Sequence, residues 1–400
     1  MSKLDDLINK LCPDGVEYKT LGEIGKVCMC KRIMKNQTES TGDIPFYKIG
    51  TFGKKADAFI SRELFEEYKS KFSFPKKGYI LISASGTIGR TVIYNGEPAY
   101  YQDSNIVWID NDETEVTNKW LYYCYQTSPW QVSTGGTIAR LYNDNIAKAI
   151  IPVPPLEVQN EIVRILDKFT SLEAELEAEL EARRKQYEYY RDSLLTFGVD
   201  VEWKALGEIA TDIYRGSGIK RDQVTSEGIP CVRYGEIYTS YNIHFNDCIS
   251  HTIIDNVPSP KYFEHGDILF AITGESVEDI AKSIAYMGNE KCLAGGDIVV
   301  LKHNQNPKYL SFALSTNDAI MQKGKGKVKS KVVHSSVPSI SEIKIPIPDL
   351  ETQEKIANIL DNFLQLTNNI TSGLPAEIEA RHKQYEYYRD KLLSFKHKEG

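Results

Sequence analysis

The sequence predicts an α+β protein with two globular domains of mixed strand and helix, separated by two long antiparallel helices that form a coiled-coil-like spacer. Three observations predict this class. A repeat spans the chain, apolar residues follow a helical spacing in the best-repeated segments, and short apolar runs ending in Gly lie between those segments. Two copies of one module predict a pseudo-two-fold relation between them.

The repeat is clearest near the end of each copy. Residues 181–197 (EARRKQYEYYRDSLLTF) and 379–395 (EARHKQYEYYRDKLLSF) are identical at 14 of 17 positions. Upstream, residues 151–169 match residues 345–363. The offset between copies far exceeds the length of a solenoid unit, so the pattern indicates duplication of a whole module.

Between the repeated segments the copies diverge, although short apolar runs keep their order. The matched runs are 45–50 with 230–235, 78–86 with 266–274, and 104–109 with 296–301. Such runs are typical of buried strands. Surfaces that dock one shared partner stay alike, whereas surfaces that bind different ligands diverge. The sequence therefore predicts one shared partner for the similar parts and two different ligands for the variable parts.

The repeated segments are predicted to be helices. Apolar residues recur mostly every three or four positions from Val158 to Phe197 and again from Ile356 to Phe395, with a stutter near Leu176. A helix from about residue 156 to 197 would be roughly 60 Å long, too long for one compact core. We therefore expect the two helices to pack against each other. Gly373 and Pro375 interrupt the second pattern and predict a helix in two pieces.

We expect four segments in chain order. They are residues 1–153 (first globular domain, with a short N-terminal helix at 2–11), 154–197 (first spacer helix), 198–346 (second globular domain) and 347–400 (second spacer helix). The LDDLINKL motif near the N-terminus resembles the repeat ends RDSLLTF and RDKLLSF. This similarity predicts a circularly permuted arrangement in which the N-terminus packs near the C-terminal helix.

The composition limits the classes of protein to which the chain can belong. No run approaches the roughly 18 apolar residues of a membrane span, and no signal-peptide pattern opens the chain. The seven Cys include no C-x-x-C pair, which indicates neither a disulfide framework nor a zinc site. We therefore expect a cytoplasmic protein with reduced thiols and no membrane contact.

The net charge of −7 lies mainly in the predicted helices, which carry −4 and −2, whereas the two variable parts carry +1 and −2. Within the variable parts, basic residues cluster, most densely at 323–331 (KGKGKVKSK). A local basic stripe, rather than net charge, indicates phosphate binding. The alternative for each cluster is an ordinary solvated surface.

Catalytic and cofactor motifs are missing. The chain has no G-x-G-x-x-G, Walker A or H-E-x-x-H pattern. The VPPLE segment at 153–157 lacks the Asn and the aromatic residue of an adenine methyltransferase signature, and the acidic residues at 13–19 are too close together for a PD…ExK nuclease. The sequence therefore predicts a non-catalytic chain without a cofactor or metal.

The phrases LGEI (21–24 and 206–209), IPVPPLEVQNEIVRIL (151–166) and IPIPDLETQEKIANIL (345–360) resemble specificity subunits of type I restriction–modification systems. The resemblance spans essentially the whole chain. It implies that each variable part is a target-recognition domain that reads one half of a split, asymmetric sequence in double-stranded DNA. It also implies that the helices dock two copies of a modification methyltransferase subunit, which uses S-adenosylmethionine to methylate adenine N6. Two restriction (translocase) subunits can join such a complex.

Residues that read DNA are expected on exposed polar or basic loops, with turn chemistry as the alternative for each polar residue. The candidates in the first domain are Lys31, Arg32, Lys48, Ser83, Ser85, Thr87, Arg90, Gly136, Thr137 and Arg140. Those in the second are Arg215, Ser217, Lys220, Arg233, Thr273, Ser276, Lys323, Lys325, Lys327, Lys329 and Lys331. The candidates for partner docking are Gln159, Ile162, Tyr187, Tyr190, Gln353, Ile356, Tyr385 and Tyr388.

Two other interpretations remain open at this point. One is a stand-alone methyltransferase or nuclease, and the other is a coiled-coil scaffold that joins two protein-binding domains. The near-identity of the repeats also suggests recombination among related genes, with exchange of recognition domains. The sequence gives neither the target bases nor their spacing, because irregular loops follow no simple residue-to-base code.

Overall fold

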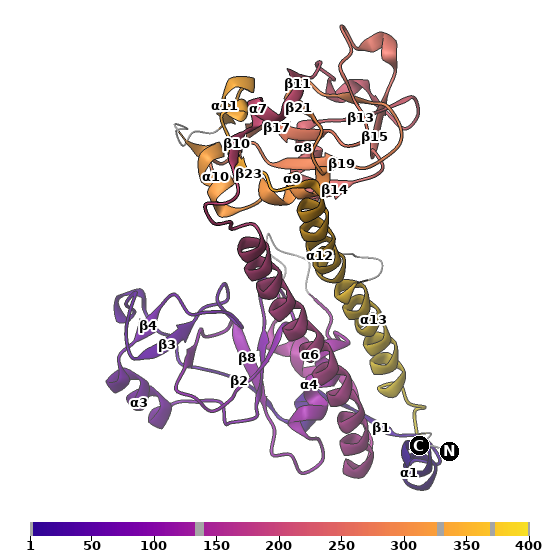
Figure 1. Cartoon of the computed structure of the whole chain (residues 1–400). Coiled ribbons are helices and arrows are strands. Elements are labelled where there is room, and N and C mark those ends of the chain that lie inside the picture. The colour runs from indigo at the N-terminus through magenta and orange to yellow at the C-terminus, as the bar shows by residue number, and fades with distance from the viewer. Residues whose placement is uncertain (1–2, 133–139, 326–331, 369–372, 399–400) are drawn as a thin grey trace. The chain divides into compact units, whose positions relative to one another are not determined.

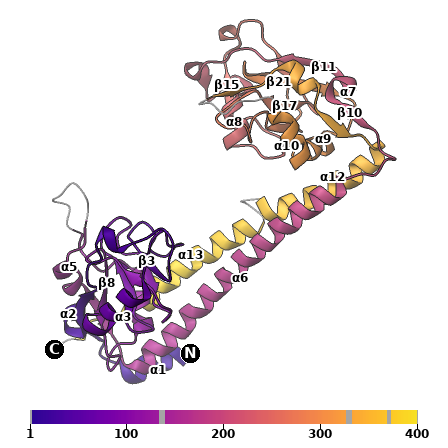
Figure 2. The same cartoon turned by 90° about the vertical axis from the view of Figure 1, so that its left-hand side faces the viewer.

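A computed structural model describes residues 3–132, 140–325, 332–368 and 373–398. The chain divides into two compact units (Figures 1 and 2): unit 1 holds residues 1–175 and 378–400, and unit 2 holds residues 176–377. The long helix α6 (Leu156–Leu194) gives its first half to unit 1 and its second half to unit 2. Each unit therefore combines one variable part with pieces of both repeated helical segments. The boundaries of the four segments expected from the sequence stay a prediction.

Unit 1 is built on a four-stranded sheet and a three-stranded sheet. The four-stranded order is β2 (Lys26–Met29), β8 (Ile106–Asp110), β5 (Ile80–Ser83) and β6 (Thr91–Ile93), all antiparallel. The three-stranded order is β4 (Phe59–Ile60), β3 (Ile44–Tyr47) and β7 (Tyr100–Tyr101), with β3 and β7 parallel. A further pair joins β1 (Glu17–Thr20) to β9 (Ile150–Val153), and the helices are α1 (Lys3–Leu11), α2 (Leu21–Ile24), α3 (Arg62–Lys71), α4 (Asn118–Gln126) and α5 (Asn143–Ala147).

The four-stranded sheet of unit 1 is buried on both faces. Ile80 and Ile82 of β5 belong to a core that also contains residues of α4 and α6, whereas Leu81 between them belongs to a second core with the three-stranded sheet. Successive side chains of a strand point to opposite faces, so a continuous apolar run is what such a strand requires. This explains why the apolar runs in the sequence do not alternate with polar residues.

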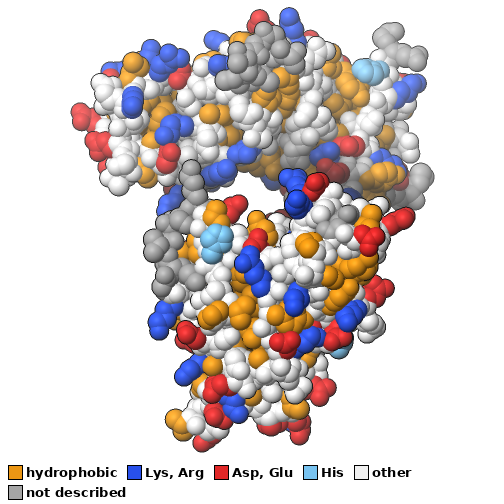
Figure 3. Space-filling model, turned by 90° about the horizontal axis from the view of Figure 1, so that it is seen from above, with side chains coloured by type: hydrophobic (Ala, Val, Ile, Leu, Met, Phe, Trp, Pro, Cys, Tyr) orange, Lys and Arg blue, Asp and Glu red, His pale blue; other side chains and the backbone are white. Residues whose placement is uncertain are grey.

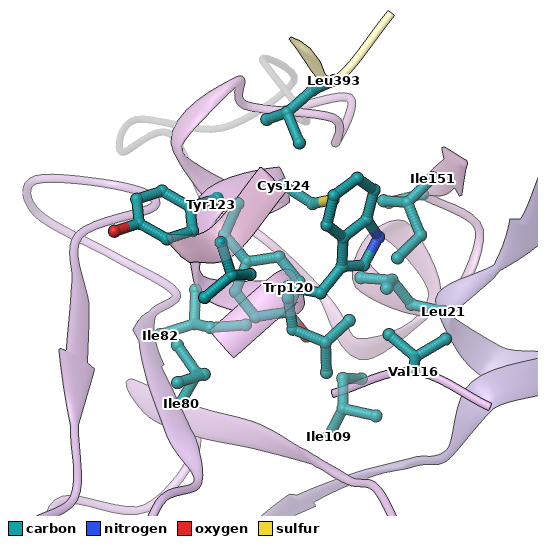
Figure 4. Packing of buried hydrophobic residues seen from close by; sticks show 14 of the residues in the cluster. Leu21, Ile80, Ile82, Ile109, Val116, Trp120, Tyr123, Cys124, Ile151 and Leu393 are labelled. Carbon is teal, nitrogen blue, oxygen red and sulfur yellow. The ribbon is translucent and has the colours of Figure 1, made fainter. Parts of the chain in front are cut away.

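Trp120 of α4 lies at the centre of the larger core of unit 1. Figure 4 shows its indole ring beside Cys124 and Ile151, with Leu393 approaching from the C-terminal segment. The indole Nε1 donates a hydrogen bond to the Pro152 backbone oxygen at 2.9 Å, so the buried polar atom is satisfied. The core thus ties the variable part to both repeated segments.

Unit 2 repeats this plan with longer sheets. One sheet has the order β11 (Ala210–Arg215), β21 (Ile298–His303), β17 (Ile268–Ala271), β19 (Ser283–Tyr286) and β14 (His244–Phe245). The other has the order β12 (Val224–Thr225), β15 (Ser250–Thr252), β13 (Ile229–Val232), β20 (Cys292–Ala294) and β16 (Tyr262–Phe263). The remaining strands of unit 2 are β10 (Trp203–Ala205) with β23 (Lys344–Pro346), and β18 (Thr273–Gly274) with β22 (Val333–His334). Its helices are α7 (Leu206–Ile209), α8 (Tyr234–Thr239), α9 (Pro307–Ala313), α10 (Asn317–Gly324) and α11 (Val337–Ser341).

The strand orders of the two units correspond. The antiparallel series β2, β8, β5 and β6 of unit 1 matches β11, β21, β17 and β19 of unit 2, and the parallel pair β3 and β7 matches β13 and β20. The duplication seen in the repeated segments therefore extends through the variable parts. Their apolar runs keep the strands, although their other residues diverge.

The repeated helices pack in a swapped manner. In unit 1, Phe169 of α6 stacks on Tyr388 of α13 (Leu374–Leu392), with ring centroids 5.5 Å apart. In unit 2, Tyr190 of α6 stacks on Phe363 of α12 (Leu350–Asn368), with centroids 5.2 Å apart. Phe169 matches Phe363 in the repeat, and Tyr190 matches Tyr388. The early part of each repeated helix thus packs on the late part of the other, as antiparallel, pseudo-two-fold packing requires.

The second repeated segment contains two helices, α12 and α13, on either side of residues 369–372, which lie outside the described residues. The expectation of a helix in two pieces is therefore confirmed. The first helix ends at Leu194, three residues before the expected end at 197.

The two chain ends meet within unit 1. Val16 forms a parallel bridge with His397, and the Tyr18 ring stacks on the His397 ring with centroids 3.7 Å apart. Leu4 of α1 lies in the same core as Leu393. The expected circularly permuted arrangement, with the N-terminus near the C-terminal helix, is confirmed.

Candidate nucleic-acid interface

Loops of unit 1 gather where β3 and β5 end and β8 begins. We define the unit-1 loop cluster as residues 48–54, 83–90, 102–105 and Arg140. The guanidinium of Arg90 donates to the Phe52 backbone oxygen at 3.0 Å, and that of Arg140 donates to the Ser104 backbone oxygen at 2.7 Å. Ser85 and Arg140 also form an isolated β-bridge. Candidates that are far apart in sequence are therefore brought together here.

The other basic candidates of unit 1 are partly neutralised. Arg32 pairs with Asp103 at 2.8 Å, and Lys48 pairs with Asp57 at 2.9 Å. Lys31 lies apart from the cluster, with its Nζ 5.1 Å from the centre of the Phe72 ring.

Arg90 and Arg140 are the better candidates for contacts with phosphates or bases. Among the described acidic residues, none forms an ion pair with either guanidinium. Thr87, at the tip of the 83–90 loop, is exposed beside Arg90, whose guanidinium lies 3.4 Å from the Thr87 hydroxyl.

The corresponding loops of unit 2 also gather at the matching strand ends. We define the unit-2 loop cluster as residues 215–218, 233–234, 272–276, 295–297 and 333–335. Ser217 forms a parallel bridge with Gly295, and Arg215 pairs with Asp297 at 2.7 Å.

Gly216 is required for the close backbone approach in this cluster. A Cβ added at this position would lie 2.2 Å from the Gly295 backbone oxygen. The loop that carries Arg215 and Ser217 is therefore held against the loop at 295–297.

His334 occupies the position in unit 2 that Arg140 occupies in unit 1. Leu141 follows Arg140, and its backbone N–H donates to the backbone oxygen of Ala84, the residue after β5, at 2.8 Å. Ser335 follows His334, and its backbone N–H donates to the backbone oxygen of Ile272, the residue after β17, also at 2.8 Å. Thr273 is the partner of His334 on the facing strand, and its hydroxyl lies 3.2 Å from the His334 Nδ1. The sequence alone does not indicate His334, because its correspondence with Arg140 depends on this pairing and the local sequences share no motif.

Two of the candidate DNA-binding residues, Ser83 and Lys323, have buried side chains. Ser83 is 1% exposed; its hydroxyl donates to the Thr87 backbone oxygen and accepts from the Arg90 backbone N–H at 2.9 Å. Lys323 is 6% exposed, and its ammonium donates to the Ser283 hydroxyl at 3.1 Å and to the Leu314 backbone oxygen at 2.8 Å. Burial lowers the pKa of Lys323 to about 7. Ser83 closes a turn and Lys323 anchors the end of α10.

The remaining candidates of unit 2 divide into engaged and exposed residues. Arg233 pairs with Glu236 at 2.9 Å, and Ser276 donates to Asp279 at 2.7 Å. Lys220 and Lys325 are exposed. The candidates Gly136, Thr137, Lys327, Lys329 and Lys331 lie outside the described residues. On the face shown in Figure 3, the coloured Lys and Arg side chains are interspersed with Asp and Glu.

Five of the eight expected partner-docking residues have buried side chains: Gln159, Ile162, Gln353, Ile356 and Tyr385. Ile162 is fully buried and Ile356 is 6% exposed. Gln159 is fully buried; its amide donates to the Glu115 and Pro154 backbone oxygens at 2.7 and 2.8 Å, and its Oε1 accepts from the Thr117 N–H at 3.0 Å.

Gln353 makes a similar set of contacts in unit 2, with a side-chain oxygen in place of one backbone oxygen. It is fully buried, donates to the Gln305 side chain and the Pro348 backbone oxygen at 2.8 Å each, and accepts from the Asn306 N–H at 2.9 Å. The repeated Gln therefore fastens the segment before α4 or α9 to the start of the long helix. These four side chains are engaged in the fold and offer little surface to a partner.

The candidate tyrosines pack mainly between helices. Tyr190 and Tyr388 stack on the Phe residues described above and keep 37% and 36% of their surface exposed. Tyr385 is 5% exposed, and its hydroxyl donates to Gln126. Burial raises the pKa of Tyr187 to about 12. The more exposed tyrosine of the repeat is the neighbouring Tyr189, at 69%.

The described residues offer no metal centre or membrane span. No three of their His, Cys, Asp and Glu side chains are placed to hold a metal ion, and none of their helices is both long and apolar enough to cross a bilayer.

Comparison with known proteins identifies the family. A family model for the type I restriction modification DNA specificity domain matches the chain twice, at residues 13–182 and 199–380. A putative type I restriction enzyme specificity subunit from Haemophilus influenzae is 64% identical over 181 residues, which is 44% of this chain and 47% of that protein. The EcoR124I/EcoR124II specificity subunit of Escherichia coli is 34% identical over 71% of this chain and 72% of its own length. The match thus spans less than half of the Haemophilus protein.

Solved structures show the same fold. The S subunit of a type I restriction–modification system from Mycoplasma genitalium aligns with a TM-score of 0.53 at 17% identity, over 95% of this chain and 96% of that one. A chain from a study of complex assembly and conformational transition of the type I system aligns with a TM-score of 0.59 at 15% identity, over 95% and 98%. In this family the specificity subunit recognises the DNA sequence and is non-catalytic, and catalysis lies in partner subunits. The chain belongs to the type I restriction–modification specificity subunits.

Proposed function

We propose that the chain recognises a bipartite, asymmetric target in double-stranded DNA, with the unit-1 loop cluster reading one half and the unit-2 loop cluster reading the other. The observation that carries this proposal is one fold present twice with different side chains at matching loop positions. Arg140 in unit 1 corresponds to His334 in unit 2. Lys48 in unit 1 corresponds to Arg233 in unit 2. Two scaffolds of the same kind with unlike reading residues suit a target with two unlike halves.

The chemistry of the two clusters supports contact with DNA. Arg90 and Arg140 carry guanidinium groups that can bind phosphates or the edge of guanine. The loops also present hydroxyl and backbone groups, such as Thr87 and Gly86, which fit close to a phosphate backbone. His334 can donate or accept a hydrogen bond, so it selects a different edge from the one that an arginine selects.

We further propose that two copies of a modification methyltransferase subunit dock on the repeated parts. Near-identical surfaces on the two repeated helices match two copies of one protein. The adenine N6 methylation and the S-adenosylmethionine site belong to that partner. Two restriction subunits are the further partners of a complex that also cleaves DNA.

The test is to map methylated adenines in DNA modified by the complex of this chain with its methyltransferase subunit. We expect a gapped motif with two unlike halves. Arg140→Ala should relax the specificity of one half, and His334→Ala should relax the other, each by about 1–3 kcal/mol of discrimination. Arg62→Ala is the matched control, because Arg62 is a solvent-exposed arginine at the start of α3, outside the loop cluster. A continuous motif, or loss of the same half in both variants, would contradict the proposal.

A further inference from the structure

Two of the seven free cysteines lie together in unit 2. Cys248 lies in the loop between β14 and β15, and Cys292 is the first residue of β20. Both side chains pack into the core between the two five-stranded sheets. The Cys248 thiol donates a hydrogen bond to the Cys292 sulfur. The fold therefore brings into contact two thiols that are distant in the sequence.

The two thiols differ in their access to solvent. Cys292 is only 1% exposed. Cys248 is half-buried and stands between two exposed residues, Asp247 and Ile249. A small solute therefore reaches the pair from the side of Cys248.

The surroundings of Cys292 favour its thiolate. The hydrogen bond from Cys248 lowers the pKa of the Cys292 thiol, and one with the Tyr286 hydroxyl, 3.3 Å from the sulfur, acts in the same direction against burial. The pKa of Cys248 is raised, first because its hydrogen is donated to Cys292 and then because of burial. The pair therefore loses one proton and holds the other between its two sulfurs. Thiolates, rather than thiols, are the groups that oxidants attack.

The other buried thiols are poorer targets for oxidation. Burial raises the pKa of four of them, at Cys12, Cys30, Cys124 and Cys231. Cys231 lies on β13 beside Leu293 of β20, and the two share a separate small core on the other face of their sheet. Successive side chains of a strand point to opposite faces, so Cys231 and Cys292 are directed apart.

Both elements that carry the pair lead to the unit-2 loop cluster. β20 continues directly into residues 295–297, and the Gly295 N–H donates to the Val232 backbone oxygen at 2.9 Å. Residues 246–249 precede β15, which pairs with β13, and β13 continues into residues 233–234. A shift of either sulfur is therefore passed to loops of this cluster.

We propose that Cys248 and Cys292 form a redox-sensitive pair, which hydrogen peroxide converts to a disulfide, and that this bond weakens recognition of the half-target read by unit 2. The second clause rests on the proposed function, whereas the disulfide itself does not. No catalytic or DNA-binding role is required of either sulfur.

The oxidation proceeds in two steps. The anion of the pair attacks peroxide through the Cys248 sulfur, the O–O bond breaks, and a sulfenic acid forms at Cys248 while hydroxide leaves and takes the remaining thiol proton. The Cys292 thiolate then attacks the Cys248 sulfur, so that the S–S bond forms, the S–O bond breaks and a second hydroxide leaves. In sum, two thiols lose two electrons and two hydrogens, and one peroxide becomes two waters.

The new bond changes the positions of the elements that it joins. A disulfide holds its sulfurs about 2 Å apart, closer than two hydrogen-bonded sulfurs. Bond formation therefore draws the loop at 246–249 and the start of β20 together, which displaces the strands that lead to the loop cluster. A disulfide formed under such strain is readily reduced by a dithiol, so the change is reversible.

The first experiment treats the full-length chain with hydrogen peroxide, blocks free thiols and maps peptides by mass spectrometry without reduction. We expect a cross-linked peptide that joins Cys248 to Cys292, lighter than the sum of its parts by two hydrogens, and restored by dithiothreitol. Cys248→Ser should abolish this peptide. Cys28→Ser is the matched control, because it removes another half-buried thiol, in unit 1, and it should leave the cross-link intact. Absence of the cross-link in the folded wild type, or a cross-link between other cysteines, would overturn the inference.

The second experiment measures DNA affinity and maps methylated adenines for the complex with the methyltransferase subunit, before and after peroxide. The oxidised wild-type complex should bind its target roughly ten-fold more weakly, about the effect of one mismatched base pair. The lost discrimination should fall on the half that His334→Ala relaxes. The Cys248→Ser complex should keep its affinity after the same treatment, which separates this pair from thiols of the partner.

The outcomes distinguish the two proposals. If the reduced wild-type complex marks no gapped motif, the proposed function fails, whatever the cross-link shows. If the cross-link forms and the affinity and motif stay unchanged, the effect on recognition is refuted. Equal losses of affinity in the peroxide-treated wild-type and Cys248→Ser complexes would place the sensitive group elsewhere and would overturn the inference.

Discussion

Replacing Gln159 with Met should destabilise unit 1 while leaving its size and shape almost unchanged. The side chain is fully buried and makes three hydrogen bonds, to the Glu115 and Pro154 backbone oxygens and from the Thr117 N–H. Methionine fills the space but makes none of them. Each lost hydrogen bond costs about 1 kcal/mol, and the three backbone groups left unpaired in the interior add to this. We expect a loss of at least about 3 kcal/mol in the free energy of unfolding of unit 1.

Tryptophan fluorescence can follow unit 1 in urea. Trp108, Trp120 and Trp130 are buried in unit 1, whereas Trp203 of unit 2 is 42% exposed and contributes little change. For a unit of this size the urea dependence is about 3 kcal/mol per M, so the midpoint should fall by about 1 M.

Gln353→Met is the matched control, because it removes the corresponding three hydrogen bonds from unit 2. It should leave the fluorescence midpoint unchanged. It should instead lower the urea midpoint for unfolding of unit 2, which circular dichroism follows. A midpoint shift below about 0.3 M for Gln159→Met would refute the reasoning that this side chain fastens the recognition domain to the helix. Equal fluorescence shifts in both variants would refute the independence of the units.

Three further predictions concern unit 2. Burial alone raises the pKa of Asp361, but hydrogen bonds from His244 and Lys308 outweigh burial and hold the pKa at about 2. The ionised Asp361 therefore stabilises the folded protein by about 2 kcal/mol above pH 4. This stabilisation is lost as the pH falls from about 4 through 2. Asp361→Asn should remove this acid-sensitive contribution in pH-dependent urea unfolding, and an unchanged pH profile would contradict the assignment. Lys323→Met should leave the DNA affinity of the assembled complex and its salt dependence unchanged, since the ammonium is buried, and a smaller salt slope would place Lys323 at the DNA after all. Gly216→Ala should weaken recognition of one half-target, because the added Cβ would lie 2.2 Å from a facing backbone oxygen; methylation mapping with both halves intact would show that the loop adapts.

Helical spacing, the helix break and the meeting of the chain ends were predictable because each depends on local pattern or on the repeat itself. The spacing of apolar residues sets which helix face is buried, and Gly373 with Pro375 marks a break whatever the rest of the fold does. The apolar runs located the central strands for the same reason. These features need no knowledge of which residues meet across the fold.

What the sequence did not indicate is the environment of polar residues whose contacts are with distant partners. Gln159 stands in a motif that looks like a contact surface, yet its partners are backbone groups some 40 residues earlier. Lys323 opens a run of lysines, but the last turn of α10 points it inward to Ser283. His334 gained its role only through the pairing of β18 with β22, which no local pattern reveals. Tyr189 was passed over in favour of the neighbouring tyrosines that prove to pack between helices.

The end of a repeated helix is joined to the first strand covalently in unit 2 and by hydrogen bonds in unit 1. In unit 2 the end of α6 continues into β10 through peptide bonds, and the Val201 N–H donates to the Gly198 backbone oxygen at 3.4 Å. In unit 1 the same junction is made by the chain termini: the Val16 N–H donates to the Lys396 oxygen at 2.9 Å, and the Lys398 N–H donates back to Val16 at 3.0 Å. Cleavage by a protease, a fused tag or a premature stop codon near residues 396–398 would therefore disrupt this non-covalent junction in unit 1. The matching junction in unit 2 is a continuous chain.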